Sequence, residues 1–349
     1  PTNGDAKMVS SMKEEVKELW KVCFTDSEAF TDLYFRLRYT DDINLAIHKG
    51  NRLISALQMI PYPMTFCGHT VQTSYISGAC THPEFRGQGS MRKLLSQAFV
   101  KMFNQQIYFT TLIPAESWLF DYYAQSGYAS VFQYAVKHHI ISGKSDKFPS
   151  HIQIQQTKDA QEATYEYLSR KLSERRCCIQ HTLKDFQIIM ADLKLSDGIL
   201  FTIRQDNIIR GIAIVYQGNP YPTIQELLAD NEKYKQILLQ AISQQSSSHQ
   251  LNEICPPIKS YPLHPLGMAR IIHAHEVLKL YALFFPEKER CIHLTDNELT
   301  DNNGYYHLYR GDCVHSQYPQ SLKYHPMNIR QLTEQTLLPL HPYMSLMLN

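Results

Sequence analysis

The first part of the chain starts with a helical pattern of apolar residues and continues with strand-like ones. The first helix is indicated by apolar residues three and four positions apart: Val16, Leu19, Trp20 and Cys23. A second helical stretch covers residues 30–37. The period then shortens to that of strands, over residues 43–47, 53–62 and 71–81, with glycine-containing turns between them. This order predicts two helices followed by an antiparallel meander.

Helices and strands alternate after the meander. A glycine-containing loop leads into a helix that is expected to end near Asn104, and residues 107–113 are apolar enough for a buried strand. A short helix over 118–125 is expected to stop at Ser126-Gly127, before a last strand over 128–138. The polar stretch 142–150 then predicts a linker. The first domain is therefore expected to span residues 1–142.

The second segment shows a similar order of elements. Helices are expected over 159–172 and 183–193, then a hairpin of strands 199–204 and 208–216, then a helix over 223–241. The hairpin that starts at Ile43 aligns without gaps with the one that starts at Ile199. This match predicts an internal duplication, with a second domain over 150–255. The alternative is that any two hairpins look alike.

A Pro-rich connector over residues 256–265 introduces a third segment. Its pattern predicts a helix over 268–285, strands over 291–294 and 305–310 around the turn at 301–304, and a helix over 328–337. The tail that follows is apolar and ends at Asn349, so we expect it to pack into the body of the protein. The third domain is expected to span residues 266–349.

Composition narrows the class of protein. The 349 residues suffice for two or three domains, and 44% of them are hydrophobic, which is typical of a globular chain. The net charge of +1 provides no general attraction to nucleic acid. No apolar stretch is long enough for a membrane span, and the N-terminus does not look like a signal peptide. The eight cysteines include no CxxC pair, which favours reduced thiols in a cytoplasmic protein without structural zinc.

One loop carries recognisable chemistry. After the third strand, Arg86-Gly87-Gln88-Gly89 opens a helix whose first turn contains Arg92 and Lys93. Glycines allow successive backbone N–H groups to face one point, and the helix N-terminus adds its positive dipole end. Together they predict a site for a phosphate or pyrophosphate. The alternative is an ordinary glycine turn at a helix start. Neither a P-loop nor a GxGxxG fingerprint is present.

The meander followed by this loop and an amphipathic helix resembles the GNAT superfamily of N-acetyltransferases. Arg86, Gly87 and Gly89 match the family's loop, whereas Met91 stands where glycine or alanine is usual. The resemblance implies that acetyl-CoA is the cosubstrate. The resemblance also implies that the loop and the strand before it bind acetyl-CoA. The residues concerned are Ala79, Cys80, Thr81, Arg86, Gly87, Gln88, Gly89, Ser90, Met91 and Arg92. In the family, the strand pairs with the pantetheine arm and offers an N–H group to the thioester carbonyl.

A second match lies in the segment 121–132, which resembles the family's Y-x-x-x-G-[FY] element through Tyr123, Gly127 and Tyr128. The resemblance implies that Tyr123 donates a proton to the departing thiolate, and a phenol is chemically suited to that role. Tyr122 is the alternative acid. Simple core packing is the competing interpretation of Tyr123.

The layout of the whole chain resembles the enhanced intracellular survival (Eis) acetyltransferases. The resemblance implies a mixed, mostly antiparallel α/β (α+β) fold, a degenerate second GNAT-like domain without the glycine loop, and a small sterol-carrier-like C-terminal domain. It also implies that the terminal carboxylate, here on Asn349, acts as the base. Glu116 and Asp121 are rival bases. A homo-oligomer is expected from the same resemblance.

These observations predict an N-acetyltransferase that needs no metal. An amine of an aminoglycoside-like or polyamine-like small molecule, or of a lysine, would attack acetyl-CoA directly in a ternary complex. The 16 histidines form no HExxH motif, and no GxSxG motif is present. Two alternatives stay open. One is a tandem-GNAT acyl- or aminoacyl-transferase, and the other is a non-enzymatic protein that binds an apolar ligand and keeps a vestigial loop.

Overall fold

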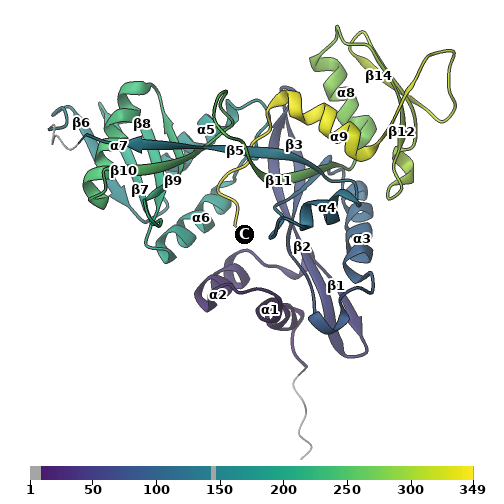
Figure 1. Cartoon of the computed structure of the whole chain (residues 1–349), viewed down its shortest axis with the longest axis horizontal. Coiled ribbons are helices and arrows are strands. Elements are labelled where there is room, and N and C mark those ends of the chain that lie inside the picture. Colours follow the sequence, from purple (N-terminus) through teal and green to yellow (C-terminus); the bar gives the residue numbers. More distant parts are fainter. Residues whose placement is uncertain (1–8, 143–146, 349) are drawn as a thin grey trace, which may run out of the picture.

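The computed structural model describes residues 9–142 and 147–348 and has a large sheet, a small sheet and flanking helices (Figure 1). The described strands of the large sheet follow the order β1-β2-β3-β4-β11-β5-β10-β9-β8-β7-β6, and those of the small sheet the order β14-β13-β12-β15. The fold is mixed α/β and its strands are mostly antiparallel, as predicted. Within the described residues, no helix combines the length and apolar character needed to cross a membrane.

The strands of the large sheet are β1 (Asn44–Lys49), β2 (Arg52–Phe66), β3 (His69–Thr81), β4 (Phe109–Leu112), β5 (Ala129–Ile140), β6 (Ile152–Thr157), β7 (Ile199–Gln205), β8 (Ile208–Tyr216), β9 (Thr223–Ala229), β10 (Gln250–Cys255) and β11 (His264–Ile271). The small sheet contains β12 (Arg290–Thr295), β13 (Gly304–Tyr309), β14 (Asp312–Ser316) and β15 (His325–Asn328). The α-helices are α1 (Met12–Cys23), α2 (Glu28–Leu37), α3 (Ser90–Asn104), α4 (Leu119–Ala124), α5 (Glu162–Ser173), α6 (Leu183–Leu195), α7 (Glu232–Ser246), α8 (Ala274–Phe284) and α9 (Ile329–Leu337).

The first helix forms where the apolar spacing predicts it. Ser11 and Glu14 make a capping box at its start, which satisfies two backbone N–H groups. Its apolar stripe, including Trp20, is buried in the core cluster that also holds residues of β2 and β3. The next helix starts after Ser27, whose side chain accepts a hydrogen bond from the Phe30 N–H. Local capping and burial of one face therefore explain both N-terminal helices.

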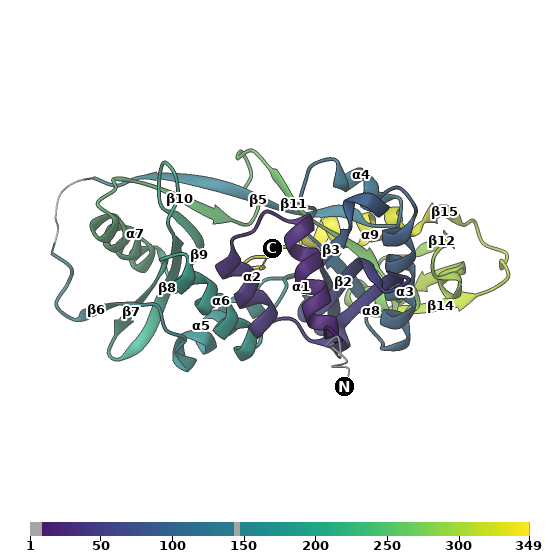
Figure 2. The same ribbon diagram turned by 90° about the horizontal axis from the view of Figure 1, so that it is seen from below.

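The long strand β5 joins the two halves of the large sheet, as Figures 1 and 2 show. Its first half pairs with β11, where Ser130 faces Met268, and its second half pairs with β10, where Ile140 faces Gln250. Strand β11 in turn lies between β4 and β5. Each half of the sheet thus includes a strand contributed from the other half of the sequence, so the halves cannot separate without breaking strand pairs.

The order of elements repeats, and we call α1 to β4 (residues 12–112) the first repeat and α5 to β10 (residues 162–255) the second repeat. The two hairpins have the same register over six corresponding pairs. Pairs 44–58, 45–57, 46–56, 47–55, 48–53 and 49–52 correspond to pairs 200–214, 201–213, 202–212, 203–211, 204–209 and 205–208. Even the bulge falls at corresponding positions, between Ile47 and His48 and between Ile203 and Arg204. This agreement favours duplication over chance similarity of two hairpins.

Several predicted elements are wrong. Residues 223–229 form β9 and not the start of a helix, and residues 268–271 belong to β11, so helix α8 begins only at Ala274. Strands β6, β10, β14 and β15 were not predicted. The expected start of the third domain, residue 266, falls inside a strand of the large sheet. The division into three domains stays a prediction.

The small sheet packs its inner face against helices α8 and α9. That face is apolar and buried: Ile292, Leu294, Tyr306, Leu308 and Met327. A fully buried ion pair between Arg270 of β11 and Asp296, at 2.6 Å, connects the two sheets. Because neither side chain is exposed, this contact fixes the position of the small sheet relative to the large one. The expected sterol-carrier-like character of this unit stays a prediction.

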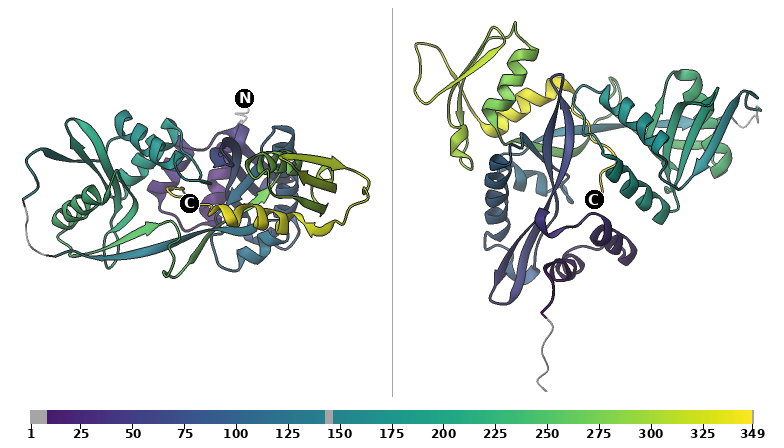
Figure 3. Two further views of the ribbon diagram at one scale, coloured as in Figure 1. Left: turned by 90° about the horizontal axis from the view of Figure 1, so that it is seen from above. Right: turned by 180° about the vertical axis from the view of Figure 1, so that it is seen from behind.

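The C-terminal tail runs between the two repeats toward α2 and α6, as Figure 3 shows. Tyr343, Met344 and Leu348 are buried, so the tail packs into the body as the sequence predicts. Its path is held by Ser345, whose carbonyl accepts a hydrogen bond from His181 at 2.9 Å. Asn349 and residues 143–146 of the predicted linker lie outside the described residues.

Candidate active site

An open strand edge marks the site. Strand β3 pairs with β2 as far as Thr81, but its parallel pairing with β4 covers only Thr73 to Tyr75. Beyond Tyr75 the two strands separate. The β4-facing edge of β3 is therefore left without its neighbouring strand just before the glycine loop. A bound ligand with amide groups can pair with such an edge.

A bulge in β3 lies in the open part of the strand. Cys80 faces Ala56 and Ser77 faces Gln58, so two residues of β3 face only one of β2. Gly78 has a φ of +61°, and a Cβ atom there would lie 2.3 Å from Gln58 and 2.5 Å from Trp20. Only glycine fits this position without a rearrangement. Bulges of this kind often redirect a strand beside an active site.

The glycine loop has two positive-φ glycines and leads into a helix start without a capping side chain. Gly87 and Gly89 have φ values of +78° and +81°, in the region that glycine adopts without strain. Gly89 is the N-cap of α3, where no side chain caps the helix and no acidic residue lies in the first turn. The first N–H groups of α3 are thus left without a capping side chain. Arg86 holds the loop by donating from Nε to the Thr81 carbonyl at 3.1 Å.

The open edge, the loop and helix α4 enclose a cleft of about 580 Å³, which we call the loop cleft. Most of the residues predicted to bind a cofactor line it: Ala79, Cys80, Thr81, Arg86, Gly87, Gly89, Ser90, Met91 and Arg92. Gln88 is exposed in the loop and is not among the lining residues. Met91 does line the cleft, so the departure from a small residue lies where a bound chain would pass. The roles of these residues stay predictions.

Tyr123 lines the loop cleft from helix α4 and is buried. Burial raises the pKa of its hydroxyl, and the neighbouring Tyr122 and Cys80 add to this effect. A phenol with a raised pKa stays protonated at neutral pH, as a proton donor must. Tyr122 also lines the cleft, and burial raises its pKa, against the effect of Arg92. Both candidate acids therefore lie at the cleft.

The rival bases differ in position. Glu116 lines the loop cleft and accepts a hydrogen bond from the Trp118 indole N–H. Asp121 is exposed on α4 and does not line the cleft. Asn349 lies outside the described residues, but the tail up to Leu348 lines a second pocket.

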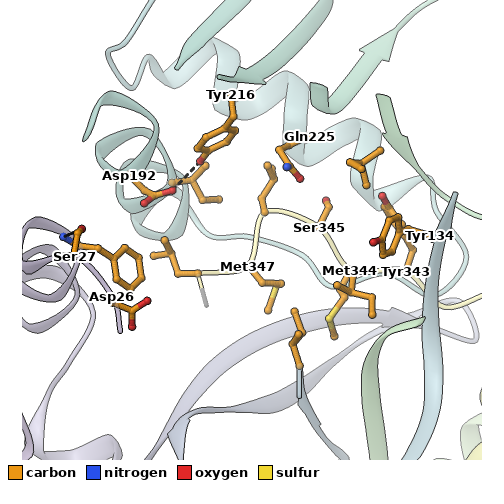
Figure 4. A pocket seen from close by; sticks show the side chains of 17 residues that line it. Asp26, Ser27, Tyr134, Asp192, Tyr216, Gln225, Tyr343, Met344, Ser345 and Met347 are labelled. Atoms are coloured by element: carbon orange, nitrogen blue, oxygen red, sulfur yellow. Dashed lines mark hydrogen bonds between the residues drawn. The ribbon is translucent and has the colours of Figure 1, made fainter. Parts of the chain in front are cut away.

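This second pocket, of about 540 Å³, we call the tail pocket (Figure 4). The tail residues 343–348 line it together with Phe30 of the first repeat and Ile189 and Gln225 of the second. Ile113 and Tyr134, from the segment between the repeats, also line it. The two pockets are neighbours. In the α1–α2 connection, Phe24 lines the loop cleft and Asp26 lines the tail pocket. In the segment after β4, Ala115 lines the loop cleft and Ile113 lines the tail pocket.

The tail pocket has an acidic character. Asp26 and Asp192 line it, and no lysine or arginine is among its described lining residues. Asp26 accepts a hydrogen bond from the Trp20 indole N–H at 2.9 Å, and Asp192 accepts one from the Tyr216 hydroxyl at 2.9 Å. Burial raises the pKa of Asp192, an effect that the hydrogen bond from Tyr216 opposes. A cation in the pocket would relieve this desolvation cost of the carboxylate.

Sequence reasoning did not identify Asp26, Asp192, Gly78 or Cys23 as residues of the site. Asp26 and Asp192 are far apart in sequence, and they line the same pocket only because α2 packs against α6. Gly78 carried a weak signal, because an isolated glycine in a strand pattern indicates a bulge. One further cluster of potential metal ligands within the described residues, Glu289, Cys291 and His307, lies on the small sheet, outside both pockets. The expectation that no metal is needed stays a prediction.

Comparisons with known proteins agree with this geometry. Residues 7–131 match the sequence profile of the acetyltransferase (GNAT) domain. Among solved structures, a GCN5-related N-acetyltransferase from Anabaena variabilis is 16% identical with a TM-score of 0.75, covering 96% of this chain and 98% of that one. A probable N-acyltransferase from Enterococcus faecalis is 14% identical with a TM-score of 0.75, covering 94% and 87%. Eis1 from Mycobacterium abscessus is 10% identical with a TM-score of 0.71, covering 93% and 87%.

A comparison with curated protein sequences gives no match. The whole-chain likeness shows a GNAT and Eis-like fold, and the profile match places an acetyltransferase domain in the N-terminal part of the chain. The match over residues 7–131 supports an acyltransferase, and the GNAT class of domain uses acetyl-CoA as cosubstrate.

Proposed function

We propose that the protein transfers an acetyl group from acetyl-CoA to a primary amine of a cationic small molecule or of a lysine side chain. The observation that carries this proposal is the pair of adjoining pockets. The loop cleft has backbone donors and arginines that suit a pyrophosphate. The tail pocket has two carboxylates that suit an ammonium group, and none of its described lining residues is a lysine or arginine.

Acetyl-CoA would occupy the loop cleft. The N–H groups at the start of α3 and the flexible glycines would hold its pyrophosphate, with Arg86 and Arg92 nearby. Its pantetheine amides would pair with the open edge of β3 at residues 79–81. A backbone N–H group there would stabilise the negative charge that develops on the thioester oxygen.

The acceptor amine would enter through the tail pocket. Its ammonium group must lose a proton before it can attack, so a carboxylate at this pocket would act as base. Asp26 is a candidate for this base, because it lines the tail pocket from the α1–α2 connection, which borders both pockets. The carboxylate expected at Asn349 is the other candidate, and the buried path of the tail up to Leu348 supports it.

The free amine would then attack the thioester carbon, and the tetrahedral intermediate would collapse to the amide and the CoA thiolate. Tyr123 would protonate the thiolate, because its buried hydroxyl is kept protonated. Holding both substrates side by side supplies much of the rate enhancement.

A charge series of amines tests this function. Spermine, a monocationic benzylamine and an aminoglycoside would each be incubated with acetyl-CoA, and acetylated products would be detected by mass spectrometry. We expect the Asp26→Asn and Asp192→Asn variants to raise KM most for the most highly charged amine. Equal KM changes across the series would contradict an acidic acceptor pocket. The base would be assigned to the tail if kcat is unchanged in Asp26→Asn and is lost after deletion of residues 347–349.

A further inference from the structure

Two cysteine thiols that the proposed reaction does not use line the loop cleft. Cys23 is the last residue of α1 and Cys80 lies in the open part of β3, and both line the cleft. The two thiols interact, because each shifts the pKa of the other. The Cys23 thiol also lies 3.5 Å from the Thr81 carbonyl oxygen.

The surroundings of Cys23 favour its thiolate. The interaction with Cys80 and the nearby Arg86 guanidinium lower the pKa of Cys23 to about 7, although partial burial opposes the change. The proton stays on Cys80, whose pKa is raised well above its usual range by Cys23 and by burial. Each sulfur thus has a distinct chemical character, one a partly exposed nucleophile and the other a protonated neighbour.

The remaining cysteines lack this combination. All eight lie in the described part of the chain, and burial raises the pKa of the other six: Cys67, Cys177, Cys178, Cys255, Cys291 and Cys313. Cys177 and Cys178 are adjacent but fully buried, and so shielded from reagents in solution. Thiols that are accessible, ionised and beside a second thiol are the ones that oxidants select.

We propose that Cys23 and Cys80 form an oxidisable thiol pair, with Cys23 as the attacking and Cys80 as the resolving cysteine. A hydroperoxide supplies the oxidant. The Cys23 thiolate attacks its terminal oxygen, the O–O bond breaks, and Cys23 sulfenic acid and water or an alcohol form after protonation. The Cys80 thiol then attacks the Cys23 sulfur, a disulfide forms, and the hydroxyl group leaves as water.

The pair lies where the proposed cofactor would bind, so a ligand in the loop cleft would cover Cys23. Protection by acetyl-CoA is therefore expected, and this part of the inference depends on the proposed function. The formation of the disulfide itself does not depend on it.

The test treats the purified protein with hydrogen peroxide, blocks the remaining thiols with iodoacetamide and maps disulfide peptides by mass spectrometry. We expect a Cys23–Cys80 disulfide in the wild type. Cys80→Ser should instead accumulate a sulfenic acid at Cys23 that dimedone traps, and Cys23→Ser should form neither product. Cys291→Ser is the matched control and should behave as the wild type. Unmodified or separately oxidised Cys23 and Cys80 in the wild type, a measurement that requires no variant, would overturn the proposal.

A pH series adds a second readout. The charged and titratable groups that face Cys23 across the cleft are Cys80, Arg86, Arg92, Glu116 and the two α4 tyrosines. With a thiolate that forms near pH 7, alkylation of Cys23 should be about tenfold faster at about pH 8 than at about pH 6. A rate that only begins to rise above about pH 8 would contradict the ionised state.

Adding acetyl-CoA separates the two proposals. Slower oxidation in its presence supports both. Equal oxidation with and without a calorimetrically saturating amount would contradict the placement of the cofactor over Cys23 and leave the thiol pair intact. Absence of the disulfide under both conditions, with acetyl-CoA binding unchanged, would refute the thiol pair alone.

Discussion

The two repeats share the register of a hairpin but differ where the third strand meets the next helix. In the first repeat, β3 leads through the glycine loop to α3, whose N-cap Gly89 offers no side chain. In the second repeat, β9 leads almost directly to α7, where the Asn231 side chain accepts a hydrogen bond from the Tyr234 N–H and Glu232 lies in the first turn. The N-terminus of α7 is thus capped by its own residues, whereas that of α3 has no capping side chain and no acidic residue in its first turn.

The strand edges beside these helices are alike in their pairing but differ in the side chains next to them. Strand β9 pairs with β10 only at Thr223 and Ile224, so it separates from its neighbour much as β3 does. Beyond this point, Glu226 is buried and bonded to Arg175 at 2.7 Å and to Ser345 of the tail at 2.5 Å. The corresponding part of β9 in the second repeat also lines a pocket, of about 400 Å³, but there Glu226 is paired with Arg175. The two repeats thus differ in their connections at the same place in the fold.

The largest expected effect concerns the contact between the repeats. Arg38 at the end of α2 donates to Asp185 of α6 at 2.8 Å, and both side chains are buried. Asp185 also forms the capping box of α6 with Thr182. Asp185→Asn should lower the free energy of unfolding by about 3 kcal/mol, because Arg38 keeps a buried charge without a counterion. Denaturant unfolding measures this, with the exposed Asp197→Asn as control, and equal stability of both variants would contradict it.

The next effect concerns Tyr123, the proposed proton donor on α4. Tyr123→Phe should lower kcat by about 100-fold without changing the Kd of acetyl-CoA, because the hydroxyl acts only when the thiolate leaves. Tyr122→Phe is the matched control on the same helix. Steady-state kinetics together with calorimetry measure both quantities. If Tyr122→Phe loses activity and Tyr123→Phe does not, the two roles are reversed.

A smaller effect is expected at the loop cations. Arg86→Ala should weaken acetyl-CoA binding by about tenfold, because a charge-assisted contact to phosphate is worth about 1.5–3 kcal/mol when buried and less at an exposed site. Arg210→Ala, a change in the second repeat, should leave the Kd unchanged. Equal weakening by both variants would indicate a general charge effect.

The smallest effect sharpens the contrast between the helix starts. Asn231→Ala should lower the free energy of unfolding by about 1 kcal/mol through loss of a cap. Gly89→Ala should lower the free energy of unfolding by about 1–2 kcal/mol, because alanine is strained at the left-handed backbone angles of this position. An added Cβ atom there would have no neighbour within 4 Å. Thermal unfolding measures both. We expect acetyl-CoA binding to weaken only in Gly89→Ala.

Local patterns in the sequence predicted much of the first repeat. The hairpins, the capped helices and the glycine loop depend on neighbouring residues, so their signals lie within short stretches. Strand β9 was predicted as a helix because Gln225, Glu226 and Leu227 favour helices, yet pairing with β8 in the sheet decides their conformation. Strand β11 has no local boundary before α8, and its partners are distant in sequence.

The candidate site was predictable only where a motif is continuous. Residues 79–92 and Tyr123 lie in two short segments, and the structure places Tyr123 and most of the predicted cofactor-binding residues at one cleft. The tail pocket could not be predicted, because it combines residues from α2, α6, β9 and the tail. Its acidic character depends on which carboxylates the packing of two repeats brings together.

A calorimetric titration of acetyl-CoA tests the central claim, that one of the two repeats keeps a cofactor site. The wild type should bind one acetyl-CoA per chain. Gly89→Glu should abolish binding, because a carboxylate would meet the pyrophosphate at the start of α3, while Asn231→Gly in the second repeat should retain it. Two sites per chain, or full binding by a folded Gly89→Glu variant, would contradict the claim.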